Sequence, residues 1–295
     1  MRRHFGEPIM RRFIIPSLAA LMAAISPVAI AQQDETSSYR EVYPENLLIM
    51  TLESGEVVIE LNEDFAPGHV EQMRELISSG IYDGERFYRV IDGFVAQGGL
   101  EVDERIEVYP TLANENERMA TDEDFVLLGN ADLFAPVVGH LDGFAVGRNP
   151  EAGTEWLLHC PGAMAMARDV DPDSGSTEFY IVLDAQRYLD RNLTVFGRVL
   201  SGMEHIQALK RGDRAIESGV IQRPERGDEI LTARLAVNIP EEERPRWEVL
   251  ETTSEDFEAF KTRLRVRTDE FFYNTPPEVL DVCAFSAPAR EISEE

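Results

Sequence analysis

The residues best suited to chemistry fall in five short segments of this 295-residue chain. They supply an arginine that can donate hydrogen bonds, a glutamine amide and several aromatic rings that can hold an apolar group. The chain has no G-x-x-x-x-G-K-[ST], G-x-G-x-x-G, H-E-x-x-H, G-x-S-x-G or C-x-x-C pattern, so the common nucleotide, zinc-protease, serine-hydrolase and dithiol sites lack support. The five segments are Glu85–Gly99, Pro161–Arg168, Ser176–Leu183, Tyr188–Asp190 and Thr194–Val199.

Metal chemistry finds little support in the sequence. The segment Asp169–Gly175 resembles a calcium-binding loop, but such a loop needs Gly at its sixth position and Glu at its twelfth. Ser174 and Tyr180 stand there instead, so we interpret the segment as a solvated acidic loop. The histidines after residue 31 lack ligand spacing, and we expect each at the surface or locally hydrogen-bonded: His69, His140, His159 and His205.

The order and spacing of the five segments resemble the cyclophilin family of peptidyl-prolyl cis-trans isomerases, over about Leu47 to Val237. The motif F-x-R-V-I-x-G-F-x-x-Q-G-G spans Phe87–Gly99, and M-A-M-A-R-x-x-D-x-D-S-x-x-S/T spans Met164–Thr177. The motif at Met164–Thr177 is most similar to that of the exported bacterial branch. The resemblance implies a mainly β fold, a closed eight-stranded antiparallel β-barrel capped by two α-helices.

The resemblance also implies a reaction, rotation about the peptide bond before proline, whose barrier is about 18–20 kcal/mol. By family position, Arg89 is the catalytic guanidinium that donates towards the prolyl nitrogen. Gln97 holds the substrate backbone and helps to orient the arginine. No cofactor, metal or covalent intermediate is needed. The apolar cup for the proline ring is Phe94, Val95, Tyr180 and Leu189, and the backbone of Ala167 and Arg168 pairs with the peptide like a strand.

Several positions depart from the family pattern. Glu178 replaces the usual Gln beside the peptide groove, where its carboxylate can pair with Arg89 or Arg168 and favour peptides with basic flanks. Tyr180 replaces the more usual Phe and adds a hydroxyl to the cup. Tyr188, also placed among the substrate-binding residues, stands where some members have Trp, and Leu193 occupies a position often filled by His.

Hydrophobic periodicity independently predicts the elements that must position these residues. Residues 66–80 fit an amphipathic helix, and Met203, Ile206 and Leu209 fit a second one closed by Gly212. Many short strands with two good helices predict a closed or nearly closed antiparallel sheet with helices over its ends. The predicted strands are 47–52, 57–61, 87–91, 94–97, 163–167, 179–183, 195–200 and 230–237.

The isomerase domain is predicted over 45–238, interrupted by a long insert at about 100–160 of weak periodicity. The insert is long enough to be functional or to carry structure of its own. A C-terminal extension, 239–295, is predicted to hold a helix from Glu255 to about Thr268, packed on the barrel and pinned by Cys283.

The N-terminus predicts export. Two Met-Arg-Arg starts, at Met1 and Met10, precede an apolar stretch and a small-x-small site at Ala29–Ala31, so residues 1–31 have the pattern of a signal peptide and 32–44 that of a flexible leader. Cleavage near Ala31 leaves a periplasmic or secreted protein without a membrane-inserted segment. In that compartment Cys160 and Cys283 are expected to form a disulfide; the alternative is two unrelated buried thiols.

Charge restricts the partners. The chain has 28 basic and 55 acidic residues, and loss of residues 1–31, with four arginines and one glutamate, takes the net charge from −27 to −30. Such a field repels nucleic acid and anionic lipid surfaces. We therefore expect a monomeric prolyl isomerase acting on proline-containing segments of unfolded or folding exported proteins. The alternatives are a non-catalytic proline-peptide-binding or chaperone module of the cell envelope, and an envelope protein that works through its insert and tail.

Overall fold

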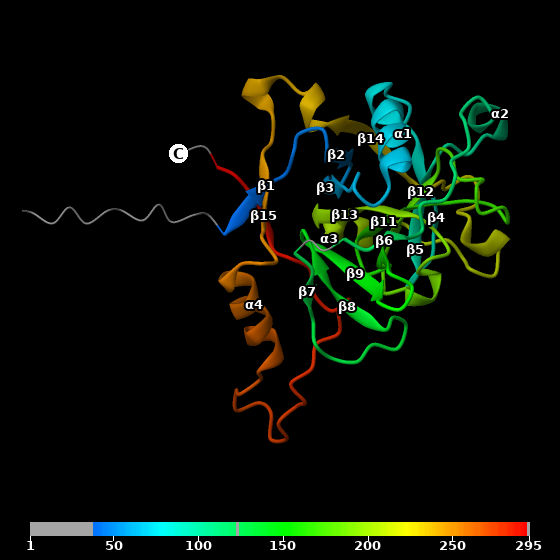
Figure 1. Cartoon of the computed structure of the whole chain (residues 1–295). Coiled ribbons are helices and arrows are strands. Elements are labelled where there is room, and N and C mark those ends of the chain that lie inside the picture. The colour runs from blue at the N-terminus through cyan, green and yellow to red at the C-terminus, as the bar shows by residue number, and fades with distance from the viewer. Residues whose placement is uncertain (1–37, 122–123, 294–295) are drawn as a thin grey trace, which may run out of the picture. The chain divides into compact units, whose positions relative to one another are not determined.

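Eight antiparallel strands close into a barrel in the computed structural model, which describes residues 38–121 and 124–293 (Figure 1). The predicted eight-stranded barrel is confirmed. The predicted signal peptide lies outside the described residues, and no helix within them is long and apolar enough to cross a membrane. In hydrogen-bonded order the strands are β11 (Ala163–Met166), β12 (Phe179–Val182), β5 (Val95–Gly99), β4 (Arg86–Val90), β14 (Asp228–Leu235), β2 (Leu47–Leu52), β3 (Gly55–Leu61) and β13 (Val195–Ser201).

The β2–β3 hairpin shows why the sequence predicts strands so clearly here. Leu48, with Met50 and Leu52, points into the main core inside the barrel, as alternation requires. Leu47 and Ile49 point outwards, yet they are buried as well, because they pack in another cluster with residues of the C-terminal tail. Burial of both faces explains the nearly continuous apolar run over 47–52.

Four α-helices occur in the described part of the chain. In α1 (Pro67–Ser78), Pro67 occupies the first turn, and Val70 and Met73 are buried in the main core with the barrel residues. The other predicted barrel helix is α3 (Met203–Gln207), which is shorter than expected and ends at Gln207. Gly212 lies beyond its end and donates its N–H to Val90 O at 2.7 Å. The remaining helices are α2 (Asp103–Ile106), α4 (Glu255–Arg265) and the 3₁₀ helices η1 (Arg187–Leu189), η2 (Glu217–Gly219), η3 (Ala236–Asn238) and η4 (Glu241–Glu243).

The insert between β5 and β11 carries a sheet of its own. Its core strands β8 (Val137–Leu141) and β9 (Phe144–Asn149) are joined by Asp142-Gly143, both with positive φ, as a tight hairpin turn requires. Glu155 is fully buried and is neutralised by Arg118 and Arg148, at 2.8 and 2.7 Å. The sheet order is β6 (Arg118–Met119), β10 (Thr154–Leu157), β9, β8 and β7 (Val126–Leu127).

The two ends of the described chain meet in a third sheet, in the order β1 (Tyr39–Glu41), β15 (Trp247–Leu250) and β16 (Ala289–Glu291). The predicted flexible leader, 32–44, is wrong for residues 39–41, which form a strand, and its first six residues lie outside the described residues. Three residues carry no visible pattern, and their partner strand comes about 200 residues later. Arg40 in β1 also pairs with the buried Glu60 of β3 at 2.6 Å.

The C-terminal tail is fastened to the insert. Helix α4 begins at Ser254, whose side chain accepts the N–H of Phe257 at 3.1 Å, and Phe257 is fully buried. A disulfide joins Cys160 to Cys283, with the Cα atoms 4.8 Å apart. It closes a loop of 123 residues, for which the chain-entropy model gives a stabilisation of about 5 kcal/mol.

His140 on β8 differs from the expectation for the histidines. It is 1 % exposed, and neither ring nitrogen has a hydrogen-bond partner among the described residues. The ring packs against Phe257 and Phe285 of the tail, at 5.3 and 5.0 Å between centroids. Burial, with Lys261 and Arg198 nearby, lowers the pKa of His140 to about 3.

This burial predicts a pH-dependent stability. Between pH 6.5 and 3 the unfolded chain binds a proton at His140 and the folded chain does not, so falling pH removes stability. His140→Leu should therefore flatten the acid side of the profile by about 1.4 kcal/mol per pH unit and keep or raise the stability at pH 7. Urea unfolding of both proteins between pH 7 and 4 measures this, and parallel curves would contradict it.

Candidate active site

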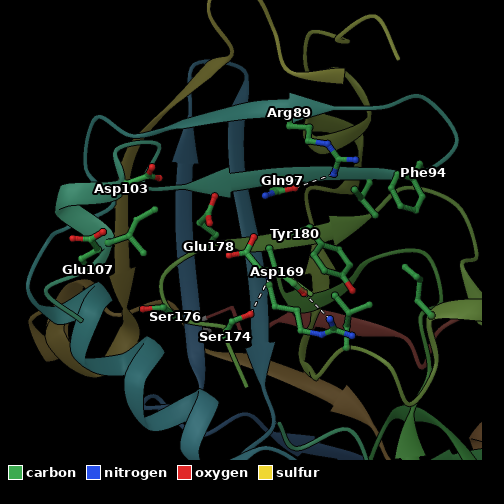
Figure 2. Close-up of a pocket in the computed structure, with 16 residues that line it drawn as sticks. Arg89, Phe94, Gln97, Asp103, Glu107, Asp169, Ser174, Ser176, Glu178 and Tyr180 are labelled. Carbon is green, nitrogen blue, oxygen red and sulfur yellow. Dashed lines mark hydrogen bonds between the residues drawn. The ribbon is translucent and has the colours of Figure 1, made fainter. Parts of the chain in front are cut away.

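A cavity of about 700 Å³ opens at the side of the barrel where β4, β5 and β12 lie next to one another (Figure 2). The fold brings nine of the ten catalytic and substrate-binding residues predicted from the sequence to this one cavity. They are Arg89, Phe94, Val95, Gln97, Ala167, Arg168, Glu178, Tyr180 and Leu189.

A straight row of side chains crosses the strands at this cavity. Gln97 of β5 lies opposite Arg89 of β4 on one side and opposite Tyr180 of β12 on the other. Residues directly opposite in an antiparallel pair share a face, about 5 Å apart. The register of the barrel therefore sets the polar pair and the cup residue side by side.

A β-bulge between Arg86 and Arg89 supplies a further residue that the sequence did not reveal. In a regular strand, Tyr88 and Arg89 would point to opposite faces, but the bulge lets both reach Gln97. Arg89 Nη1 donates to Gln97 Oε1 at 2.9 Å, and Gln97 Nε2 donates to the Tyr88 hydroxyl at 2.6 Å. Tyr88 in turn donates to the Glu178 carboxylate.

The contacts of Glu178 correct one expectation. Its carboxylate pairs with neither Arg89 nor Arg168, because its partners are the Tyr88 hydroxyl and the Gln97 amide. The guanidinium of Arg168 instead donates to Asn192 O at 3.1 and 2.7 Å, and to Asp169 O of its own loop at 2.7 Å. Burial raises the pKa of Glu178, although the bond from Tyr88 opposes this shift.

The guanidinium of Arg89 is held on two sides. Besides its bond to Gln97, Nε donates to Ser218 O in η2 at 2.9 Å, and the group lies 5.8 Å from the centre of the Phe94 ring. Burial lowers the pKa of Arg89, and the neighbouring Arg214 acts in the same direction, while Tyr88 opposes them. Among the described residues Nη2 has no hydrogen-bond acceptor, so it can donate into the cavity.

Apolar side chains form the other part of the cavity wall. Val95 and Tyr180 are buried, and Phe94 and Leu193 pack partly buried against the same cluster. Leu189 also lines the cavity. These side chains can hold a small apolar ring next to the Arg89 guanidinium, as Figure 2 shows for Phe94 and Tyr180.

The backbone beside the cup is partly occupied. The Ala167 N–H donates to Glu178 O at 2.9 Å, so strand-like pairing of this residue with a peptide would use its carbonyl. Opposite Phe94 the cavity is acidic, since Asp103 and Glu107 at helix α2 lie on that side with Glu178 (Figure 2). Sequence reasoning missed these two carboxylates because the insert showed no periodicity that would place them.

Tyr188 is the one predicted site residue that lies away from the cavity. Its side chain is 60 % exposed and lines a separate depression with Arg187 and Trp156. Both Tyr188 and Leu189 lie in η1, where successive side chains differ in direction by about a third of a turn. Leu189 therefore faces the cup and Tyr188 does not. The structure also shows no cluster of three or more His, Cys, Asp or Glu fit to bind a metal in residues 38–121 and 124–293.

An eight-stranded barrel with this Arg–Gln pair beside an apolar cup defines a cyclophilin-type protein, and comparisons agree. Residues 47–235 match the family described as cyclophilin type peptidyl-prolyl cis-trans isomerase/CLD. The chain is 31 % identical over 223 residues to the "Probable peptidyl-prolyl cis-trans isomerase" of Brucella suis biovar 1, covering 74 % of this chain and 93 % of that protein. It is 31 % identical over 163 residues to peptidyl-prolyl cis-trans isomerase B of Bacillus subtilis, covering 55 % and 89 %.

Among solved structures, cyclophilin AquaCyp293 from Hirschia baltica superimposes with a TM-score of 0.72 at 28 % identity, covering 87 % of this chain and 94 % of that one. The chain belongs to the cyclophilin-type peptidyl-prolyl cis-trans isomerase family. It is a peptidyl-prolyl cis-trans isomerase.

The chain of hydrogen bonds from Glu178 to Arg89 predicts the effect of Tyr88→Phe. Loss of the hydroxyl frees the Gln97 amide and with it the orientation of Arg89, so kcat should fall about tenfold while KM stays within about twofold. A protease-coupled assay on a short proline peptide separates the two constants. Tyr43→Phe, at a 69 % exposed tyrosine outside the cavity, is the matched control. An unchanged kcat in Tyr88→Phe would contradict the prediction.

Proposed function

We propose that this cavity is the isomerase active site and that the protein accelerates rotation of X-Pro bonds in exported proteins as they fold. One observation carries the proposal: Arg89 Nη1 is fixed by Gln97 at 2.9 Å beside an apolar cup that includes Phe94. A charged donor beside an apolar cup is what this reaction needs.

The chemistry follows from the peptide bond. Resonance between the nitrogen lone pair and the carbonyl gives a rotation barrier of about 18–20 kcal/mol, and uncatalysed exchange takes tens to hundreds of seconds. A guanidinium N–H that donates to the prolyl nitrogen localises the lone pair there and weakens the resonance. Arg89 is the catalytic residue in this proposal. The N–H of Nε is bonded to Ser218 and one N–H of Nη1 to Gln97, so the donor is one of the remaining N–H groups of Nη1 and Nη2.

The other residues divide the remaining work. The cup of Phe94, Val95, Tyr180 and Leu189 holds the proline ring while the preceding carbonyl turns. Gln97 orients Arg89 through its oxygen, and its amide nitrogen donates to the Tyr88 hydroxyl and also stabilises the Glu178 carboxylate. In the proposal the same amide holds the substrate backbone. Ala167, Arg168 and the Glu178 edge of the cavity line the flanking peptide.

The cellular role is proposed on separate grounds. Residues 1–31 have the pattern of a secretory signal, and the Cys160–Cys283 disulfide suits an oxidising compartment. An exported protein with an X-Pro isomerase site would act on proline-containing segments of other exported proteins in the periplasm or outside the cell. The strongly acidic composition favours clients that are neutral or basic.

Arg89→Ala tests the active site. Loss of the donor should lower kcat/KM by about a hundredfold while the peptide still binds the apolar cup. Two-dimensional exchange NMR on a short Ala-Pro peptide reports binding and exchange together. Arg263→Ala, an exposed arginine on α4, should keep the wild-type rate. Exchange in Arg89→Ala within about twofold of wild type would exclude Arg89 as the catalytic group.

Export has its own test. Expressed from Met1 in a bacterium with a periplasm, the protein should appear in the periplasmic extract with Gln32 as its first residue and with the disulfide formed. Intact-mass measurement with and without a reductant decides both points. Replacing Ala29 and Ala31 by Arg should block cleavage, because the site requires small residues. A wild-type chain that keeps residues 1–31 and stays in the cytoplasm would refute export.

A further inference from the structure

A histidine lies behind the cup and contacts one of its walls. Tyr180 is 4 % exposed, and its hydroxyl lies 2.9 Å from His159 Nε2. His159 is fully buried and belongs to the segment between β10 and β11, so the insert supplies it. The two rings are nearly parallel, with 18° between their planes.

Asp190 fixes the other edge of the His159 ring. Its Oδ1 lies 3.1 Å from His159 Nδ1 and also accepts the backbone N–H of His159 at 2.9 Å. A carboxylate only accepts, so Nδ1 carries the hydrogen, and in this tautomer Nε2 accepts from the Tyr180 hydroxyl. Burial raises the pKa of Tyr180, which keeps the hydroxyl protonated as this donor.

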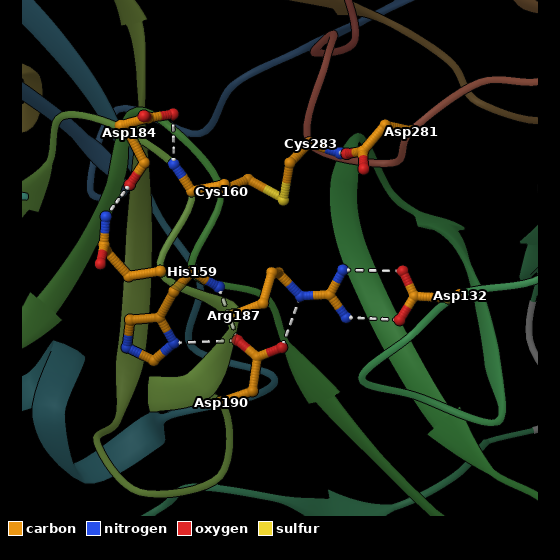
Figure 3. Close-up of a disulfide and its surroundings, with 10 residues drawn as sticks. Asp132, His159, Cys160, Asp184, Arg187, Asp190, Asp281 and Cys283 are labelled. Atoms are coloured by element: carbon orange, nitrogen blue, oxygen red, sulfur yellow. Dashed lines mark hydrogen bonds and ion pairs between the residues drawn. A yellow bond between two sulfur atoms is a disulfide. The ribbon is translucent and has the colours of Figure 1, made fainter. Parts of the chain in front are cut away.

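The carboxylate is itself held by an ion-pair network (Figure 3). Arg187 Nε donates to Asp190 Oδ2 at 2.6 Å, and its two terminal nitrogens bind both oxygens of Asp132 at 3.0 and 3.1 Å. Asp132 comes from the insert, between β7 and β8. All of these side chains are nearly buried, and the next residue after His159 is the disulfide-bonded Cys160.

We propose that His159 is a positioning residue for the isomerase: it fixes the Tyr180 ring in the wall of the proline cup, and Asp190 fixes His159. The proposal rests on the proposed function of the cavity. A phenylalanine at position 180 would be held by packing alone. The hydroxyl anchors the far end of the ring to a network that does not touch the substrate, so the ring can neither swing into the cup nor withdraw from it.

This role predicts where the kinetic loss appears. The cup holds the proline ring equally in the ground state and the transition state, and loss of such uniform binding raises KM and leaves kcat. Loss of the Arg89 guanidinium or of the Tyr88 hydroxyl, in contrast, is expected to lower kcat. A general loosening of the protein would not separate the two constants in this way.

The experiment is a double-mutant cycle on the full mature chain, with kcat and KM measured on a short Ala-Pro peptide. The variants are His159→Leu, His159→Gln, Tyr180→Phe and His159→Leu with Tyr180→Phe. His140→Leu is the matched control, because it removes another buried histidine of the insert that has no bond to the cup. Thermal unfolding of each variant reports whether it is folded.

His159→Leu should raise KM about fivefold and leave kcat within about twofold, while His159→Gln, whose amide can still bond to the tyrosine hydroxyl, should stay within about twofold of wild type. In the Tyr180→Phe background, His159→Leu should add less than about twofold, because the bond that transmits its effect is gone. His140→Leu should leave both constants unchanged.

The proposal is overturned if folded His159→Leu keeps the wild-type KM, or if it raises KM by the same factor with and without the Tyr180 hydroxyl. Should His159→Leu fail to fold, Tyr180→Phe decides alone, and an unchanged KM in that variant overturns the proposal. An inactive wild type would instead refute the proposed function of the cavity, so the two failures are distinguishable.

Discussion

The pairing order β11-β12-β5-β4 is the constraint on which the site depends. Backbone hydrogen bonds place Arg89 opposite Gln97, Gln97 opposite Tyr180, and Tyr180 opposite Ala165. A slip of one residue in any of these pairs would turn the moved side chains from the cavity to the barrel interior. Closure of the barrel removes the free edges at which such slips begin. The geometry of the site is therefore set by register before any side-chain contact forms.

Guanidinium groups attach the peripheral segments to this barrel. Arg198 of β13 and Arg40 of β1 both pair with the buried Glu60, and Arg187 reaches Asp132 of the insert. A buried carboxylate is costly unless it is paired and hydrogen-bonded, and the planar fork of arginine satisfies both oxygens at once. In a chain with this excess of acidic residues, these arginines thus stabilise buried carboxylates of the barrel and of the insert.

The sequence was sufficient where local pattern and local structure coincide. Each of the eight barrel strands lies within about two residues of a predicted strand, α1 has an apolar face at helical spacing, and the motif around Phe87–Gly99 placed Arg89, Phe94 and Gln97 at one cavity. The sequence was insufficient where a contact depends on how segments that are separated in the chain pack together. A bulge that turns Tyr88 beside Arg89 has no signature in the sequence, and His159 contacts Tyr180, 21 residues away, only once the barrel and insert have packed together.

Two networks meet at the cavity without sharing a side chain. Hydrogen bonds connect Glu178 and Tyr88 through Gln97 to Arg89, while others connect Asp190 and His159 to Tyr180 in the apolar wall. The network of Glu178 lies in β4, β5 and the residue before β12. The network of Asp190 extends into the insert, next to the disulfide that joins the insert to the tail. Because the Arg89 guanidinium and the Tyr180 ring are held by separate hydrogen-bond networks, a change in the insert or the tail can shift Tyr180 and leave the contacts of Arg89 in place.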